Sequence, residues 1–575
     1  MSDTAHPAFI SARRLPNLMD LVAGAIILAA VIYIVTVARG TLAHIDDPNA
    51  TSLTLDPWAL PGYAVRTTLR MLAALVCSLL FTFTYATWAA KSRRASLVLI
   101  PILDVLQSVP ILGFLTFTVV FFMSLFPGQV LGAELAAIFA IFTSQAWNMA
   151  FSLYQSLQTV PADLAEASKS LRLSGWQRFW RLEVPFAMPG LVWNTMMSMS
   201  GGWFFVVASE AITVGDTTWK LPGIGSYVAL ALDQKNLAAI FYAIVAMLVV
   251  ILAYDQLLFR PLVAWSSKFR FETTASEAVE DPWVLKLLRR TRLLRTLSGY
   301  LGDIFGLFGG LRLSLAPGRR RTVRRAPSRA GDIVFGAILA LGVAVALWKI
   351  YGFASADLSW SDFTQAGLDG LITLLRVVVL IILATLIWVP VGVWLGLRPK
   401  WARRAQPVAQ FLAAFPANLF FPIFVVTIVH FSLNQDIFLT PLMILGTQWY
   451  ILFNVIAGAS AYPGDLQEAA NNFRVGGWLW WRRVILPGIF PYYVTGAITA
   501  SGGSWNAAIV SEVATWGEDH LRAHGLGAYI ADATAAGHTA QVILGCAVMS
   551  AFVIAFNRLL WRPLYAYANR RLTLG

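Results

Sequence analysis

One polar stretch occurs twice in this 575-residue chain, and the second copy follows the first at an offset of 302 residues. The copies span residues 161–185 and 463–487. The same offset, without a gap, relates matched residues well outside the two stretches: Trp147 and Trp449, Trp203 and Trp505, Glu210 and Glu512, and Gly225 and Gly527. A match of this length indicates two copies of one structural unit.

The composition places the chain in a membrane. Hydrophobic residues make up 58% of the chain and charged residues 13%, and the mean hydropathy is +0.66. This balance excludes a soluble globular domain, and about twenty apolar residues suffice to cross a bilayer. Six apolar segments are expected in each half: 20–39, 66–90, 104–126, 131–158, 186–213 and 237–260, then 332–352, 371–396, 410–432, 438–460, 488–515 and 538–561.

The loop charges predict how these segments are oriented. The loop 41–65 carries aspartates and no lysine or arginine, whereas the next connection carries Lys91, Arg93 and Arg94, and the second half repeats this contrast. Basic loops lie on the cytoplasmic side, so the N-terminus and the central linker are expected inside. Because each half has six spans, an even number, the second half enters the membrane in the same orientation as the first. The two halves are therefore expected to form a parallel repeat. The expected domains are 1–262, a basic linker 263–331, and 332–575.

The duplicated stretch itself predicts a short helix between two spans. Asp163 and Asp465 are expected at the N-cap, with Glu166 and Glu468 three residues later in a capping-box arrangement. The glycines of Ser174-Gly175 and Gly476-Gly477 are expected to make the following turn, and prolines at 185 and 487 to open the next span.

These residues resemble the signature of permease subunits of ATP-binding-cassette (ABC) importers, most closely the nitrate, sulfonate and taurine branch. The family's Glu-Ala-Ala and Leu-Pro elements stand as Glu468-Ala469-Ala470 and Leu486-Pro487, and more loosely as Glu166-Ala167-Ser168 and Val184-Pro185. Arg172 and Arg474 stand where the family has glycine. The resemblance implies that both loops dock on ATPase subunits through a common set: Asp163, Glu166, Ala167, Gly175, Asp465, Glu468, Ala469, Ala470 and Gly477.

The resemblance also implies the fold, location and partners. It implies an all-α membrane protein of about twelve transmembrane helices in two parallel six-helix repeats, in a bacterial inner membrane. Two ATPase subunits would bind ATP and Mg, and an extracytoplasmic binding protein is compatible with the family. The implied cargo is a small oxyanion such as nitrate, taurine or an aliphatic sulfonate. The chain contains no phosphate-loop motif, so ATP hydrolysis is expected in a separate subunit; no cofactor, metal or nucleic acid is expected on this chain.

Polar residues inside the apolar segments are candidates for a translocation path, because such residues usually face a bundle interior or water. The candidates are Gln145, Asn148, Ser200, Trp203, Gln448, Ser504, Trp505 and Asn506. Glu210 and Glu512 are expected near the outer end of the fifth span of each half. We expect them to have a gating or structural role, paired with a cation such as Arg66, Arg70 or Arg376.

Two other functions and two interpretations of the linker stay open. An ion-coupled secondary transporter also uses parallel repeats, and Glu210 with Glu512 is the matched pair that could bind its ion. A membrane enzyme would need a catalytic cluster, which is not found in the sequence. The linker segment 285–315 mixes apolar residues with arginine, which fits either an interfacial amphipathic helix or a flexible tether.

Overall fold

The computed structural model describes most of the chain. The described residues are 18–41, 53–107, 109–214, 217–269, 283–285, 291–311, short pieces between 336 and 352, 357–460, 462, 464–517 and 519–571. Most of the basic linker, most of the expected span 332–352 and Pro463 lie outside them. Packing groups the chain into two compact units, one from residues 1–40, 160–189 and 255–319 and a larger one from 41–159, 190–254 and 320–575.

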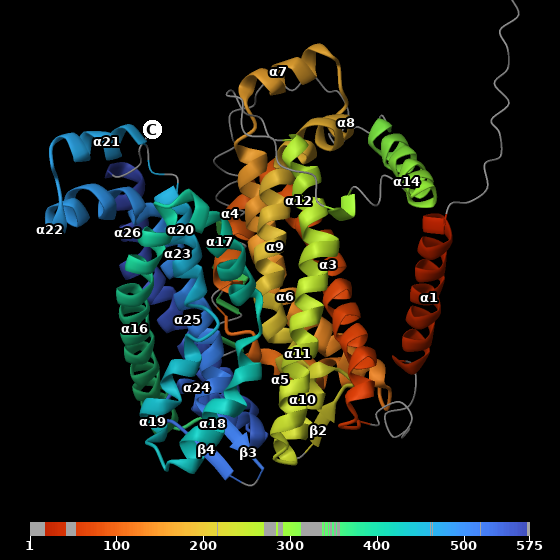
Figure 1. Cartoon of the computed structure of the whole chain (residues 1–575). Helices are drawn as coiled ribbons and strands as arrows, with labels where there is room; N and C mark the ends of the chain where they lie inside the picture. The colour runs from red at the N-terminus through yellow and green to blue at the C-terminus, as the bar shows by residue number, and fades with distance from the viewer. Residues whose placement is uncertain are drawn as a thin grey trace, which may run out of the picture. The chain divides into compact units, whose positions relative to one another are not determined.

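Helices dominate the described residues (Figure 1). In the first half they are α1 (Leu18–Thr41), α3 (Leu60–Lys91), α4 (Arg93–Leu106), α5 (Leu115–Leu125), α6 (Val130–Gln158), α7 (Ala162–Ser170), α8 (Gly175–Arg178), α9 (Val184–Ser209), α10 (Ile224–Asp233), α11 (Leu237–Tyr254) and α12 (Arg260–Ser266). The linker contributes α14 (Arg292–Gly310). In the second half they are α16 (Trp360–Gly396), α17 (Pro399–Ala414), α18 (Phe421–His430), α19 (Gln435–Phe438), α20 (Trp449–Ser460), α21 (Gly464–Asn472), α22 (Gly477–Trp480), α23 (Leu486–Ser511), α24 (Leu526–Ala535), α25 (Thr539–Phe556) and α26 (Arg562–Arg571).

Six of the described helical stretches are long and apolar enough to cross a membrane, and a seventh is added if α17 and α18 are counted as one bent span. That pair bends by 80° at Phe415-Pro416, because proline removes a backbone donor and clashes with the preceding turn. Pro110 interrupts the corresponding segment of the first half between α4 and α5. The expected spans 104–126 and 410–432 are therefore broken helices, and 438–460 contains only short helices.

A small antiparallel hairpin follows the fifth span of each half, which the sequence did not predict. β1 (Ala211–Val214) pairs with β2 (Thr217–Lys220), and β3 (Val513–Trp516) pairs with β4 (Asp519–Arg522). The fifth helices consequently end at Ser209 and Ser511, four residues before the expected ends. In the larger unit, β3 and β4 lie at the opposite end of the helices from α21 and α26 (Figure 1).

The duplicated stretch forms helices, but their starts differ from those predicted. α7 begins at Ala162 with Pro161 at the N-cap, so Asp163 lies within the first turn and does not cap it. α21 begins at Gly464, so Asp465 also lies inside its helix. The capping box is found instead at α8. There the Gln177 amide donates to the Ser174 hydroxyl, and the Ser174 amide donates to Oε1 of Gln177.

The predicted starts of the fifth spans are also corrected. Wide π-helical turns at Phe179–Glu183 and Trp481–Ile485 join α8 to α9 and α22 to α23. Each fifth helix therefore begins near Gly175 or Gly477, ahead of the proline that was expected to open it. Proline has no backbone N–H to donate. It is tolerated here because the π-helical turn before it already departs from the α-helical hydrogen-bond pattern.

The bend after each of the two duplicated helices, α7 and α21, is built on an arginine. Arg172 and Arg474 adopt left-handed backbone angles, with φ of 51° and 52°. At the first bend the Leu173 amide donates to the Ser168 carbonyl at 3.1 Å and the Arg172 amide donates to the Lys169 carbonyl at 3.0 Å. This pattern is a Schellman motif, in which glycine is the usual residue at the left-handed position. The chain thus makes this bend with arginine in place of glycine.

Substituting glycine for both Arg172 and Arg474 is expected to stabilise the protein. A side chain in the left-handed region is strained, and relief of that strain outweighs the added freedom of the unfolded chain by roughly 0.5–1 kcal/mol per site. Thermal unfolding in detergent measures the effect, with Lys169→Gly inside α7 as the destabilising control. A lower midpoint for Arg172→Gly than for the parent would contradict this explanation of the bend.

Glycine allows close packing where α10 and α24 fold back on the fifth helices. A Cβ atom at Gly225 would overlap the Val207 carbonyl oxygen, and one at Gly527 would overlap the Ala508 carbonyl oxygen. The two glycines are related by the same offset of 302 residues, although the carbonyls that they meet are 301 residues apart. Both halves therefore use glycine to seat the returning helix on the end of the fifth helix.

Candidate functional site

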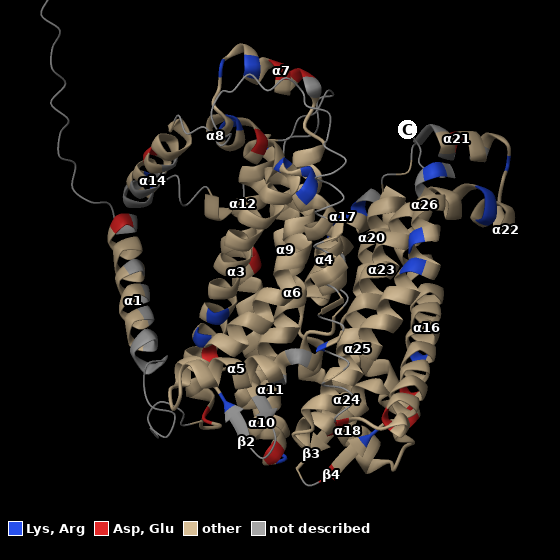
Figure 2. Ribbon diagram, turned by 180° about the vertical axis from the view of Figure 1, so that it is seen from behind, with Lys and Arg blue, Asp and Glu red and all other residues tan. Residues whose placement is uncertain are grey.

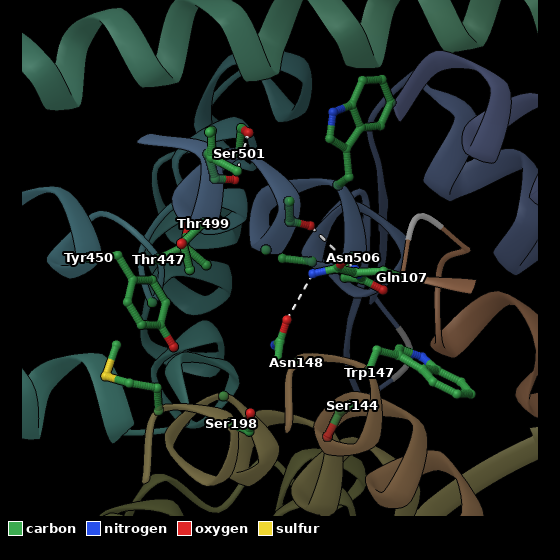
Figure 3. A pocket seen from close by; sticks show the side chains of 18 of the residues that line it. Gln107, Ser144, Trp147, Asn148, Ser198, Thr447, Tyr450, Thr499, Ser501 and Asn506 are labelled. Atoms are coloured by element: carbon green, nitrogen blue, oxygen red, sulfur yellow. Dashed lines mark hydrogen bonds between the residues drawn. The ribbon is translucent and has the colours of Figure 1, made fainter. Parts of the chain in front are cut away.

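A cavity of about 1000 Å³ lies inside the larger unit and is lined by both repeats (Figure 3). Its polar lining comes from α6, α9, α20 and α23 and from the broken third segments. These residues include Gln107, Ser144, Asn148, Asn194, Ser198 and Ser200 of the first half and Thr447, Tyr450, Asn454, Thr499, Ser501 and Asn506 of the second. A chamber with amides and hydroxyls from two facing repeats can bind a small polar molecule at the repeat interface.

The charged lining of the cavity is entirely positive. Arg558 and Arg562 line its edge, and no aspartate, glutamate, lysine or histidine is among the described residues that line it. Arg562 begins α26, which lies with α21 at one end of the larger unit (Figure 1). The electrostatic environment therefore favours an anionic or neutral occupant over a cationic one.

Three residues that line the cavity have a buried polar atom without a hydrogen-bond partner among the described residues. These atoms are the Nε1 of Trp505, the Nε1 of Trp561 and the Oγ of Ser198. A buried donor without a partner costs free energy, and an occupant with acceptor oxygens would remove that cost. The side chains of Ser198, Tyr450 and Asn148 point toward the same open space in Figure 3.

The broken third segments meet the fifth helix of the opposite half at equivalent positions. The backbone amide of Ile111 donates to Oδ1 of Asn506 at 2.8 Å, and Nδ2 of Asn418 donates to the Phe204 carbonyl at 3.3 Å. Phe204 and Asn506 are related by the offset of 302 residues. At the first break the other half satisfies a backbone amide, and at the second break the Asn418 side chain reaches a carbonyl of the other half. Both contacts join the two repeats beside the cavity.

The structure separates the eight predicted path residues into two groups. Asn148, Ser200, Trp505 and Asn506 line the cavity, and Gln145, Trp203, Gln448 and Ser504 do not. The second group packs between helices. Gln145 is hydrogen-bonded to Ser78, and Ser504 to Thr447. Gln448 accepts a hydrogen bond from Trp388. The ring of Trp203 meets the ring of Tyr254 edge-on. Sequence reasoning missed Tyr450 and Thr499, which correspond to Asn148 and Met197 in the other repeat.

A buried ion cluster surrounds Glu210. Arg70 holds Glu134 with two hydrogen bonds of 2.6 and 2.7 Å and holds Glu210 with a third of 2.7 Å. Thr67 donates to the same Glu210 oxygen at 2.6 Å, and the Gly225 amide donates to the other at 2.6 Å. The side chains of Arg70, Glu134 and Glu210 are 4%, 8% and 0% exposed. The cluster therefore ties α3, α6, the end of α9 and the start of α10 together.

The second half repeats this cluster around Glu512 with weaker geometry. Arg376 donates to Glu512 at 3.3 Å and to Asp436 at 2.9 Å, and Thr373 donates to Glu512 at 2.9 Å. The Ala528 amide donates to the other Glu512 oxygen at 3.0 Å. The expected pairing of both glutamates with a basic residue is thus observed, with Arg70 and Arg376 as the partners.

The two clusters differ in their access to solvent. The Asp436 side chain is 41% exposed, whereas its counterpart Glu134 is almost fully buried. Although partial burial opposes ionisation, hydrogen bonds from the His524 backbone and ring and the charge of Arg376 hold the pKa of Asp436 below its ordinary value. The first cluster is therefore sealed, and the second is open at the hairpin end of the larger unit.

The residues predicted to contact an ATPase lie mainly on the surface of their own helices. Asp163, Glu166 and Ala167 are exposed on α7, and Glu468 is exposed on α21, whereas Ala470 is buried. Gly175 and Gly477 are exposed at the starts of α8 and α22. Ala469 is half-buried, and the Asp465 side chain lies outside the described residues.

A known family covers both repeats. The family described as "Binding-protein-dependent transport system inner membrane component" matches residues 78–260 and again residues 388–573, which together are more than half of the chain. The chain belongs to this family. It carries two copies of the family domain, so the repeat seen in the sequence is a duplication of a permease domain within one polypeptide.

Individual permeases of this family are similar over part of their length. The bicarbonate transport system permease protein CmpB of Synechococcus elongatus is 28% identical over 176 residues, which are 31% of this chain and 60% of that protein. The nitrate import permease protein NrtB of Leptolyngbya laminosa is 26% identical over 187 residues, 32% of this chain and 63% of that protein. The glycine betaine/proline betaine transport system permease protein ProW of Escherichia coli is 26% identical over 187 residues, which are 32% of this chain and 49% of that protein. The chain thus matches less than two thirds of the length of these relatives, and no solved structure matches it.

Proposed function

We propose that this chain is the permease of an ATP-driven importer in a bacterial inner membrane. Its two halves form the translocation path, and its two coupling helices, α7 and α21, connect the path to separate ATPase subunits that bind ATP and Mg. The observation that carries the proposal is a polar cavity lined by both copies of a permease domain. On this proposal the chain performs no reaction of its own, and a substrate-binding protein delivers the cargo from outside.

The proposed orientation places α21 in the cytoplasm. In the larger unit, lysine and arginine gather near α17, α22 and α26, and acidic residues gather toward α18, α24 and the β3–β4 hairpin (Figure 2). This distribution favours a cytoplasmic α21 end under the positive-inside rule. The N-terminus and the basic linker would then be cytoplasmic, and the Glu210 and Glu512 clusters would lie near the outer surface.

A small oxyanion is the cargo that the cavity fits best. The lining offers hydroxyl and amide donors and two arginines without an acidic side chain, and two of the relatives are named for bicarbonate and nitrate. A betaine is the second candidate, because Trp147, Trp193 and Tyr492 also line the cavity and aromatic rings can hold a quaternary ammonium. Competition of each solute against labelled cargo in a transport assay distinguishes the two classes.

Copurification tests the importer proposal directly. The solubilised chain, expressed from its native operon, is expected to carry ATPase subunits at two per chain, measured by native mass spectrometry. A double variant with Glu166→Arg and Glu468→Arg is expected to lose them while eluting as a folded protein. A chain that transports with no ATPase bound would support the secondary-transporter alternative.

Filling the cavity should block transport without unfolding the protein. Gly502 lines the cavity, and a Cβ atom there meets no other atom within 4 Å. We expect Gly502→Leu to reduce uptake by roughly tenfold or more because the side chain occupies the path, with little change in thermal stability. Gly367→Leu on α16 is the matched control, since its Cβ also has open space and lies outside the cavity. Equal transport by both variants would exclude this cavity as the path.

A further inference from the structure

The linker helix α14 is attached to α8, which with the proposed coupling helix α7 forms the first coupling segment (residues 162–178). The second coupling segment is its counterpart, α21 and α22 (residues 464–480). Nε1 of Trp176 donates to the Phe308 carbonyl at 2.7 Å, and Nε2 of Gln177 donates to the Gly310 carbonyl at 3.0 Å. The Phe308 ring stands edge-on to the rings of Trp176 and Trp180, at 4.8 and 5.3 Å between centroids. The C-terminal end of α14 is therefore docked on α8, in the smaller unit, by polar and aromatic contacts together.

Among the residues that the structure describes, no contact of this kind is made by the corresponding segment of the second half, α22. Trp478 is the counterpart of Trp176 by the offset of 302 residues, and it is 73% exposed. Leu479 beside it is 54% exposed. The linker thus makes the two copies of the coupling segment unequal, although their sequences are alike.

An apolar stripe runs along α14 next to this attachment, and its Leu307 and Leu311 border a shallow hollow with Arg181. Tyr300, Ile304 and Leu307 follow one another at intervals of four and three residues, so they lie on one face of the helix. Leu311, the capping residue just after the last turn, continues the spacing. The four residues are 65%, 60%, 74% and 45% exposed. Gly302 lies on the opposite face, where a Cβ atom would meet nothing within 4 Å. Four exposed apolar side chains in one line form an interaction surface.

The charge around this stripe identifies its partner. Residues 286–329 contain twelve lysines and arginines and one acidic residue, Asp303. A strongly basic segment with an apolar helical face is typical of a helix that lies at the surface of a membrane containing anionic lipids. A protein partner would need a matching acidic, apolar groove, whereas a bilayer surface is available beside every membrane-spanning helix.

We propose that α14 lies on the anionic cytoplasmic surface of the membrane with Tyr300, Ile304, Leu307 and Leu311 inserted, and that it anchors the first coupling segment, and not the second, to the lipid. Lipid headgroup charge would then act on transport through one half of the permease. The inference goes beyond the proposed function, because the helix could anchor to lipid whatever drives the transport.

Depth measurements on the full-length chain test this inference. In a background with Cys77→Ser and Cys546→Ser, a single cysteine at Ile304→Cys or Gly302→Cys receives an environment-sensitive fluorophore, and the chain is placed in nanodiscs. With phosphatidylglycerol present, nitroxide-labelled lipid is expected to quench the label at 304 at least about threefold more than the label at 302, since the two face opposite sides of the helix. Replacing phosphatidylglycerol by phosphatidylcholine should reduce this difference.

Three outcomes would overturn the inference. Equal, weak quenching at 304 and 302 would show that α14 stays in water. Unchanged quenching in phosphatidylcholine would remove the role of anionic headgroups. Protection of the 304 label only after an ATPase subunit is added would assign the stripe to a protein partner. A Leu307→Glu variant adds a functional readout: transport should lose its dependence on phosphatidylglycerol while the thermal midpoint stays at that of the parent chain.

Discussion

Replacing Arg70 by leucine is expected to destabilise the protein by roughly 3–5 kcal/mol, because removal of one partner from a buried ion cluster leaves unpaired charges in a dry site. Glu134 and Glu210 would both lose their cation, and both are nearly inaccessible to water. Thermal unfolding of the solubilised protein, followed by size-exclusion chromatography, measures the loss.

The chain provides two matched controls for this experiment. Arg66 lies one turn earlier on α3 outside the ion cluster, so Arg66→Leu should be close to neutral. Arg376→Leu removes the equivalent cation of the second half, and its effect should be smaller because Asp436 is already 41% exposed. Adding Glu134→Gln and Glu210→Gln to Arg70→Leu should recover part of the stability. Equal stability of the Arg70→Leu and Arg66→Leu proteins would show that the cluster is not structural.

The second large effect is expected at the coupling helices. Glu166→Arg and Glu468→Arg each reverse one exposed charge on α7 and α21, where the proposed ATPase subunits bind. A charge reversal at the centre of an interface commonly costs 2 kcal/mol or more, about thirtyfold in affinity. Each single variant should reduce transport-stimulated ATPase activity, and the double variant should abolish it.

The contrast between single and double variants separates coupling from folding. All three proteins should have the thermal midpoint of the parent, since neither side chain is buried. If the double variant transports at the parental rate, α7 and α21 do not transmit ATP-driven motion, and the importer proposal fails.

The helical part of the fold could be predicted because long apolar segments and a duplication at a constant offset leave few alternatives. The hairpins were missed although Gly215-Asp216 is a two-residue turn signal. The strands have only four residues each, and Ala211–Val214 is as apolar as the helix before it. The start of α7 was misplaced since Asp163 fits an N-cap by type, whereas Pro161 takes that position.

The candidate site was predictable where residue type repeats between the halves. Glu210 and Glu512 are identical, so the offset of 302 identified both, and the same offset relates Glu134 to Asp436, a match that sequence reasoning overlooked. Cavity residues seldom repeat in type, because the two halves line different sides of one chamber. Asn148 corresponds to Tyr450, for example, and both line the cavity.

Uptake into proteoliposomes that contain the chain with its ATPase subunits tests the central claim most directly. Labelled nitrate or bicarbonate, offered with the cognate binding protein, should enter only when ATP is supplied on the ATPase side. Uptake should persist when ionophores collapse the proton and sodium gradients. Uptake that follows an imposed ion gradient and proceeds without ATP or the ATPase subunits would contradict an ATP-driven importer.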